Sequence, residues 1–98
     1  MPAVRVAGAC VLLALGAACS KKASPAQCEQ LVDHYAEVVV RAASPNASAE
    51  SHAVARARER DDARNDDLFR NCTSEILAAD YACAMSATTA ASLEKCLQ

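Results

Sequence analysis

Cysteine constrains this chain more than any other residue type. Its 98 residues include six cysteines but only two tyrosines, one phenylalanine and no tryptophan. A chain this short with so few large side chains builds only a marginal hydrophobic core. Small exported domains compensate with disulfides, which contribute about 2–4 kcal/mol each. The available folds therefore depend on which cysteines pair, among Cys10, Cys19, Cys28, Cys72, Cys83 and Cys96.

The N-terminal segment predicts export. Arg5 is the only charge among the first 20 residues, and residues 6–18 form an uncharged, mostly apolar run. A run of this length fits the central region of a signal peptide, whereas a helix across a bilayer core of roughly 30 Å needs about 20 residues. Small residues directly precede Cys19, as a signal peptidase requires. We therefore assign residues 1–18 to a cleaved signal peptide.

The end of this segment resembles the lipobox of bacterial lipoproteins. Ala17, Ala18 and Cys19 match its pattern, while Gly16 stands where leucine is usual, with a leucine one position earlier. The resemblance covers about the first 20 residues and implies cleavage before the cysteine and attachment of diacylglycerol, with palmitate-type chains, to its sulfur. Residues 19–24 would then be the lipidated cysteine and a short polar tether. Ordinary secretion, with cleavage near Cys19, is the alternative.

The number of cysteines agrees with lipidation at Cys19. Cleavage removes Cys10, and the lipid blocks the Cys19 thiol, so four cysteines remain. An even number in a short exported domain predicts two disulfides. Secretion without acylation would instead leave five cysteines, one of them with an exposed thiol.

The charge of the mature chain argues against nucleic acid as a partner. The 80 residues from Cys19 onward suffice for one small domain. Loss of Arg5 leaves nine basic against 12 acidic residues, a formal net charge of −3. Proteins that bind nucleic acid need a basic face for the phosphates, which this balance does not supply.

The clearest helix signal follows the tether. Ser24, Pro25 and Gln27 form the pattern of a helix start, with a capping box and proline at the first helical position. The helix should end near Ser44, because the proline that follows pushes this residue out of the α region. One apolar stripe with a helical period connects the two ends, and it comprises Cys28, Leu31, Val32, Tyr35, Val38, Val39 and Ala42.

Three further helical segments complete an all-α prediction. A charged helix is expected over residues 48–71, an apolar one from residue 73 or 74 to 87, and a short final helix after a break at residues 88–89. Apolar residues surround the third helix on nearly all sides, so we expect it to be the buried centre. No stretch alternates as a strand would. The fold is therefore predicted as a small disulfide-stapled bundle of three to four helices over residues 25–98.

The middle of the second helix, residues 56–67, has little apolar character. Arg58 and Asp62 are spaced to form a helix-supporting pair. Asp66 and Arg70 have the same spacing, and such pairs contribute a few tenths of a kcal/mol each. A charged docking surface would explain this run, but a solvated helix face is the interpretation that we favour.

The helix pattern favours one of three possible disulfide pairings. Cys83 and Cys96 lie at similar distances on either side of the break at residues 88–89, as an antiparallel helix pair requires. Cys28 and Cys72 would then meet at the open end of the longer hairpin. We therefore favour Cys28–Cys72 with Cys83–Cys96, and the alternative is Cys28–Cys83 with Cys72–Cys96.

Motifs that carry known chemistry are missing from the sequence. The cysteine spacings of 44, 11 and 13 residues contain no Cys-x-x-Cys pair for zinc, haem or thiol redox chemistry. No glycine follows Gly16, so no glycine-rich phosphate loop can form. His34 and His52 have no neighbouring nucleophile and are expected at surface or boundary positions. We predict neither catalytic residues nor a cofactor, and the alternative is a metal site of Cys28, Cys72, Cys83 and His34.

These observations predict a lipoprotein of the bacterial cell envelope with a structural or protein-binding role. Residues 81–96 also resemble the ends of small lipoproteins from diderm bacteria, which imply no activity. The membrane is the partner through lipid on Cys19, and another envelope protein is a candidate partner. Ser20 is not aspartate, which by analogy with enteric sorting favours the outer membrane over the inner one. The alternatives are a redox or metal-binding envelope protein and an unanchored secreted effector or inhibitor.

Overall fold

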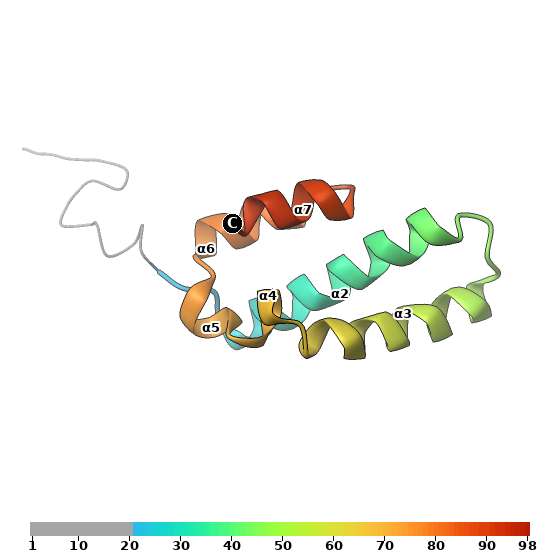
Figure 1. Cartoon of the computed structure of the whole chain (residues 1–98), viewed down its shortest axis with the longest axis horizontal. Coiled ribbons are helices and arrows are strands. Elements are labelled where there is room, and N and C mark those ends of the chain that lie inside the picture. The colour runs from blue at the N-terminus through green and yellow to red at the C-terminus, as the bar shows by residue number, and fades with distance from the viewer. Residues whose placement is uncertain (1–20) are drawn as a thin grey trace, which may run out of the picture.

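Helices account for most of the chain between Lys21 and Gln98, the residues that the computed structural model describes (Figure 1). This part of the chain contains no β-strand, so the predicted all-α, disulfide-stapled fold is confirmed. The predicted signal peptide and Cys19 lie outside the described residues. The helices are α2 (Pro25–Ala43), α3 (Ala49–Arg64), α4 (Asp67–Arg70), α5 (Cys72–Glu75), α6 (Ala78–Met85) and α7 (Ala90–Cys96).

The longest helix, α2, begins as the sequence predicts. The Ser24 Oγ accepts a hydrogen bond from the Gln27 backbone N–H at 3.1 Å, and the Gln27 Oε1 accepts one from the Ser24 N–H at 2.9 Å. This capping box satisfies two amides that no helical turn can pair. The helix ends at Ala43, directly before Ser44 and its proline. Its buried residues lie along the predicted stripe or beside it, and they are Leu31, Val32, Ala36, Val38 and Val40.

Two of the predicted helices are each divided in two. The charged helix ends at Arg64, and the Asp66 side chain accepts a hydrogen bond from the Leu68 N–H at 2.8 Å to start α4. Aspartate side chains compete with the backbone in this way and favour helix starts over helix interiors. The apolar helix is interrupted at Ile76, which adopts an extended conformation between α5 and α6. Between Lys21 and Gln98 the result is six helices, two of them single turns, where the sequence predicts three to four.

The interruption at Ile76 is paired with the beginning of the described chain. The Ala23 N–H donates to the Ile76 carbonyl, and the Ala78 N–H donates to the Lys21 carbonyl, both at 2.8 Å. Lys22 and Leu77 form an isolated antiparallel bridge between these bonds. Residues 21–23 therefore belong to the folded domain and not to the tether predicted over residues 19–24.

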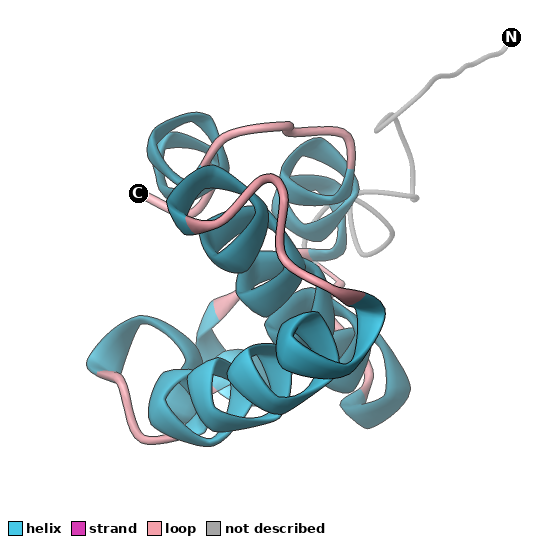
Figure 2. Ribbon diagram, turned by 90° about the vertical axis from the view of Figure 1, so that its right-hand side faces the viewer, coloured by secondary structure: helices cyan, strands magenta, loops and turns pink. Residues whose placement is uncertain are grey.

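The hydrophobic core lies between α2, α7 and the short helices. Leu31 and Leu93 are fully buried, and the Tyr35 and Phe69 rings pack with centroids 5.0 Å apart. The prediction that the third helix forms the buried centre is wrong, because Ala84 is the one buried residue of α6. Its apolar character comes largely from alanines, which bury little surface. Helix α2 takes the central place instead, between α3 on one side and the α6–α7 pair on the other (Figures 1 and 2).

Two disulfides staple this arrangement. Cys28 near the start of α2 is bonded to Cys72 at the start of α5, and Cys83 of α6 is bonded to Cys96 of α7. The Cα atoms are 6.0 Å and 5.7 Å apart, within the usual range for disulfides. This is the pairing that the helix pattern of the sequence favours. None of the helices between Lys21 and Gln98 has the length and apolar character needed to cross a bilayer.

Candidate functional site

A regularly spaced set of charged side chains joins α2 to α3. Three acids, each four residues from the next, lie on one face of α2, and three arginines with the same spacing face them from α3. Because the two helices run antiparallel, the acid nearest the start of α2 meets the arginine nearest the end of α3. We call this set the charge ladder: Arg64–Glu29 at 2.6 Å, Arg60–Asp33 at 3.3 Å and Arg56–Glu37 at 3.5 Å.

The charge ladder gives the polar middle of α3 partners on α2, where the spacing of its charges predicts pairs within one helix. Within residues 21–98, the expected pairs Arg58–Asp62 and Asp66–Arg70 do not form ion pairs. The ladder arginines are only 32–42% exposed, so more than half of each side chain is covered where α3 packs on α2. Ala63 is the one buried residue of α3. Charge pairs and arginine stems therefore take the place of an apolar seam along most of this helix.

Glu37 is the most densely paired residue of the ladder. Its carboxylate accepts hydrogen bonds from His52 Nε2 at 3.0 and 3.1 Å, from the Arg41 Nε and from Arg56. The hydrogen bonds from His52 and Arg41, reinforced by their charges, lower the pKa of Glu37 to about 2. The Glu37 side chain is 23% exposed, so water screens part of this interaction. The carboxylate remains ionised at any neutral or mildly acidic pH.

Glu37 should make the domain sensitive to acid. Its pKa is lower in the folded chain than in the unfolded one, so its contribution is fully present above about pH 4.5 and is lost as the pH falls towards 2. We expect Glu37→Gln to lower the free energy of unfolding at pH 7 by about 1 kcal/mol. The variant should also lose less of its free energy of unfolding than the wild type when the pH falls from 5 to 2. Urea unfolding at both pH values measures this. Asp62→Asn is the control, since Asp62 forms no ion pair within residues 21–98. Equal effects of the two variants would contradict the proposal that the ion pairs of Glu37 make the domain sensitive to acid.

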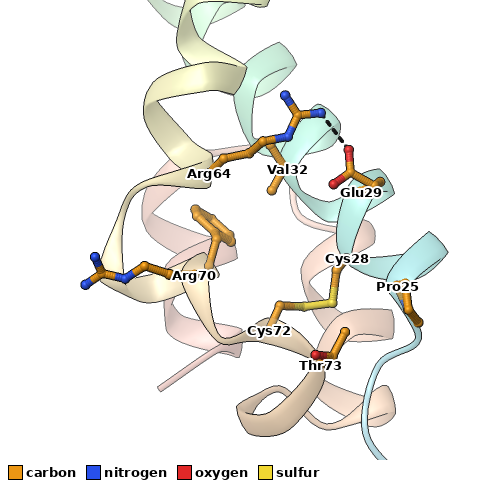
Figure 3. Close-up of a pocket in the computed structure, with 9 residues that line it drawn as sticks. Pro25, Cys28, Glu29, Val32, Arg64, Arg70, Cys72 and Thr73 are labelled. Atoms are coloured by element: carbon orange, nitrogen blue, oxygen red, sulfur yellow. Dashed lines mark hydrogen bonds and ion pairs between the residues drawn. A yellow bond between two sulfur atoms is a disulfide. The ribbon is translucent and has the colours of Figure 1, made fainter.

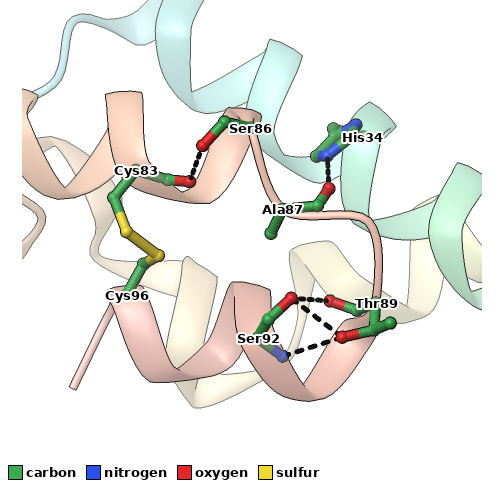
Figure 4. Close-up of a disulfide and its surroundings, with 7 residues drawn as sticks. All are labelled: His34, Cys83, Ser86, Ala87, Thr89, Ser92 and Cys96. Carbon is green, nitrogen blue, oxygen red and sulfur yellow. Dashed lines mark hydrogen bonds between the residues drawn. A yellow bond between two sulfur atoms is a disulfide. The ribbon is translucent and has the colours of Figure 1, made fainter.

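Polar contacts also fix the other side of α2 to the α6–α7 pair. His34 Nε2 lies 2.8 Å from the Ala87 carbonyl in the turn between α6 and α7, so the ring donates its N–H there (Figure 4). The Tyr35 hydroxyl donates to Glu94 of α7 at 3.1 Å. Burial, together with this bond to a carboxylate, raises the pKa of Tyr35 to about 12. The Thr89 side chain caps α7 beside the turn.

A shallow groove follows α2 between these two sets of contacts. Its apolar lining includes the buried Val38, and Glu37 and Arg41 supply its charged groups. The groove continues towards Gln30 and Met85 on the same side of α2. We call it the α2 groove, lined by His34, Glu37, Val38, Arg41, Ala42, Ala87 and Thr88.

A second hollow lies beside the Cys28–Cys72 disulfide. Figure 3 shows the disulfide and Val32 on its walls, with the Arg64 side chain directed to Glu29 across its upper edge. Arg70 points away from the hollow and pairs with Asp67 of its own helix. Both guanidinium groups are thus engaged with carboxylates.

The residues that the metal alternative would combine are engaged in other bonds. Cys28 and Cys72 share one disulfide and Cys83 belongs to the other, so none of these sulfurs is a thiolate that could bind a metal. His34 donates to a backbone carbonyl, and His52 pairs with Glu37. Within residues 21–98 no group of three potential ligands is close enough to hold a metal ion.

No family model, curated protein or solved structure matches the sequence.

Proposed function

We propose that this chain is a lipid-anchored protein of the bacterial cell envelope with a structural or protein-binding role. The observation that carries the proposal is the distribution of the cysteines. The four between residues 28 and 96 pair with one another, so none of them is available to Cys19. Cys19 directly follows a signal-like segment and small residues, where diacylglycerol on the sulfur would block its thiol.

The proposed role is non-catalytic because the polar groups around α2 hold helices together. Glu37 is engaged by His52 and Arg41, and His34 is engaged by the backbone of the α6–α7 turn. A general acid or base needs a proton that it can exchange with a substrate, and a nucleophile needs a neighbouring base. The α2 groove is the surface that we propose for binding another envelope protein.

Lipid attachment is tested by metabolic labelling with an alkyne fatty acid in a diderm bacterial host. We expect the wild-type chain and Cys10→Ser to carry the label, because Cys10 lies in the segment to be removed. Cys19→Ser should lose the label completely and leave the membrane fraction. Label that survives in Cys19→Ser, or a wild-type chain without label, contradicts the proposal.

The outer membrane is the proposed location, supported by Ser20 after the lipidated cysteine, where aspartate would favour inner-membrane retention. Separation of the two membranes on a density gradient locates the labelled chain. Its enrichment with inner-membrane markers contradicts this part of the proposal while leaving the lipid anchor intact.

A further inference from the structure

The folded domain begins two residues after the proposed site of the lipid. Lys21 accepts a hydrogen bond from Ala78 at 2.8 Å, and Ala23 donates one to Ile76 at the same distance. Ala23 is only 3% exposed and belongs to the main hydrophobic core. Residues 21–23 are therefore held by two backbone hydrogen bonds and by a buried side chain.

This docking shortens the reach of the chain from the membrane. A trans backbone spans at most about 3.3–3.6 Å per residue, so residues 19–24 could separate domain and lipid by about 17 Å if all were extended. With Lys21 docked, only Ser20 lies between it and Cys19, and the Cα atoms of residues 19 and 21 are at most about 7 Å apart. That distance is smaller than the diameter of a helix with its side chains, about 10–12 Å.

From this geometry we infer that one end of the domain rests directly on the phospholipid headgroups; the inference depends on the proposed lipid at Cys19. We call this the anchor end, and it consists of residues 21–26, α5 and the first turn of α6. Lys21 and Lys22 are exposed there, where their ammonium groups can meet lipid phosphates. The described chain begins at this end, and the turn between α2 and α3 lies at the opposite end (Figure 1).

The same geometry directs the α2 groove away from the bilayer. Helix α2 has 19 residues and extends for about 28 Å from the anchor end towards the α2–α3 turn. Val38, Arg41 and Ala42 lie in the distal half of this helix. A partner in the envelope could therefore reach these residues while the anchor end stays in contact with lipid.

The test compares the two ends of the lipidated protein in vesicles of phosphatidylethanolamine and phosphatidylglycerol. Ala79→Cys at the anchor end and Ala47→Cys in the α2–α3 turn both replace exposed alanines. Each is labelled with a thiol-reactive fluorophore, and quenching by a headgroup-attached quencher lipid is measured. We expect several-fold stronger quenching at position 79 than at position 47. A Gly-Ser insertion of about 12 residues after Ser20, with a reach of about 20 Å, should reduce quenching at position 79 to the level at position 47.

Equal quenching at the two positions, or quenching at position 79 that is unchanged by the insertion, overturns the inference. Mass spectrometry of the same preparations determines whether Cys19 carries lipid. A lipidated protein with equal quenching overturns only the membrane contact, whereas an unmodified Cys19 overturns the proposed anchor and the contact together. Circular dichroism of both labelled variants verifies that each has the wild-type helix content.

Discussion

Replacing both Cys28 and Cys72 with alanine should lower the free energy of unfolding by about 4 kcal/mol. The two residues are separated by 44 positions, and a cross-link over such a length restricts the unfolded chain strongly. Cys72 is 5% exposed, so alanine is preferred to serine because it does not bury an unpaired hydroxyl. Domains of this size are stable by only a few kcal/mol, so we expect a substantially unfolded population at 37 °C.

The second disulfide provides the matched comparison. Cys83 and Cys96 are separated by 13 positions, and their replacement by alanine should cost about 3 kcal/mol because the closed loop is shorter. Urea unfolding of both double variants, followed by circular dichroism at 222 nm, measures the difference. A larger loss in the Cys83–Cys96 variant would mean that packing around the disulfides, and not the length of the closed loop, decides their contributions.

The sequence predicts the elements whose signals lie within a single helix. The Ser24–Gln27 capping box and the apolar stripe of α2 both operate over a few residues, and both are present in the structure. The disulfide pairing could also be inferred, because the turn at residues 88–89 places Cys83 opposite Cys96. The α3–α4 break at Asp66 has a local cause as well, but the charged residues on both sides of it favour helix and conceal it.

The features of the fold that the sequence does not predict depend on contacts between residues that are distant in the sequence. Ile76 is extended because it pairs with Ala23, 53 residues away, and nothing near Ile76 reveals that partner. His34 likewise binds the carbonyl of Ala87, a group that every residue possesses. Propensity and periodicity describe one element at a time, so they cannot identify such contacts.

The charge ladder did leave a signal in the sequence. Acids at positions 29, 33 and 37 and arginines at positions 56, 60 and 64 share a spacing of four, and their order reverses as an antiparallel hairpin requires. Arg58 and Asp62 have the same spacing within one helix, which makes local pairing an equally valid interpretation. Whether the charges pair within α3 or between the two helices depends on the docking of α3 on α2, which is a tertiary property.

The second large effect is expected in the core, at the two leucines that are fully buried. Leu31 of α2 and Leu93 of α7 are both 0% exposed. Replacing either with alanine removes apolar contacts and leaves a cavity, which typically costs 2–5 kcal/mol, about as much as a disulfide. We expect each variant to unfold at a markedly lower urea concentration with an unchanged denaturant slope, because the fold itself is retained.

Val54→Ala is the matched control for the core variants. Val54 lies on α3 and is 54% exposed, the one large hydrophobic residue within residues 21–98 with such exposure. Its truncation opens no cavity, so the free energy of unfolding should stay within about 0.5 kcal/mol of the wild-type value. If Leu31→Ala and Val54→Ala were equally stable, α2 could not be the centre of the core, and the two disulfides would be holding together a domain without one.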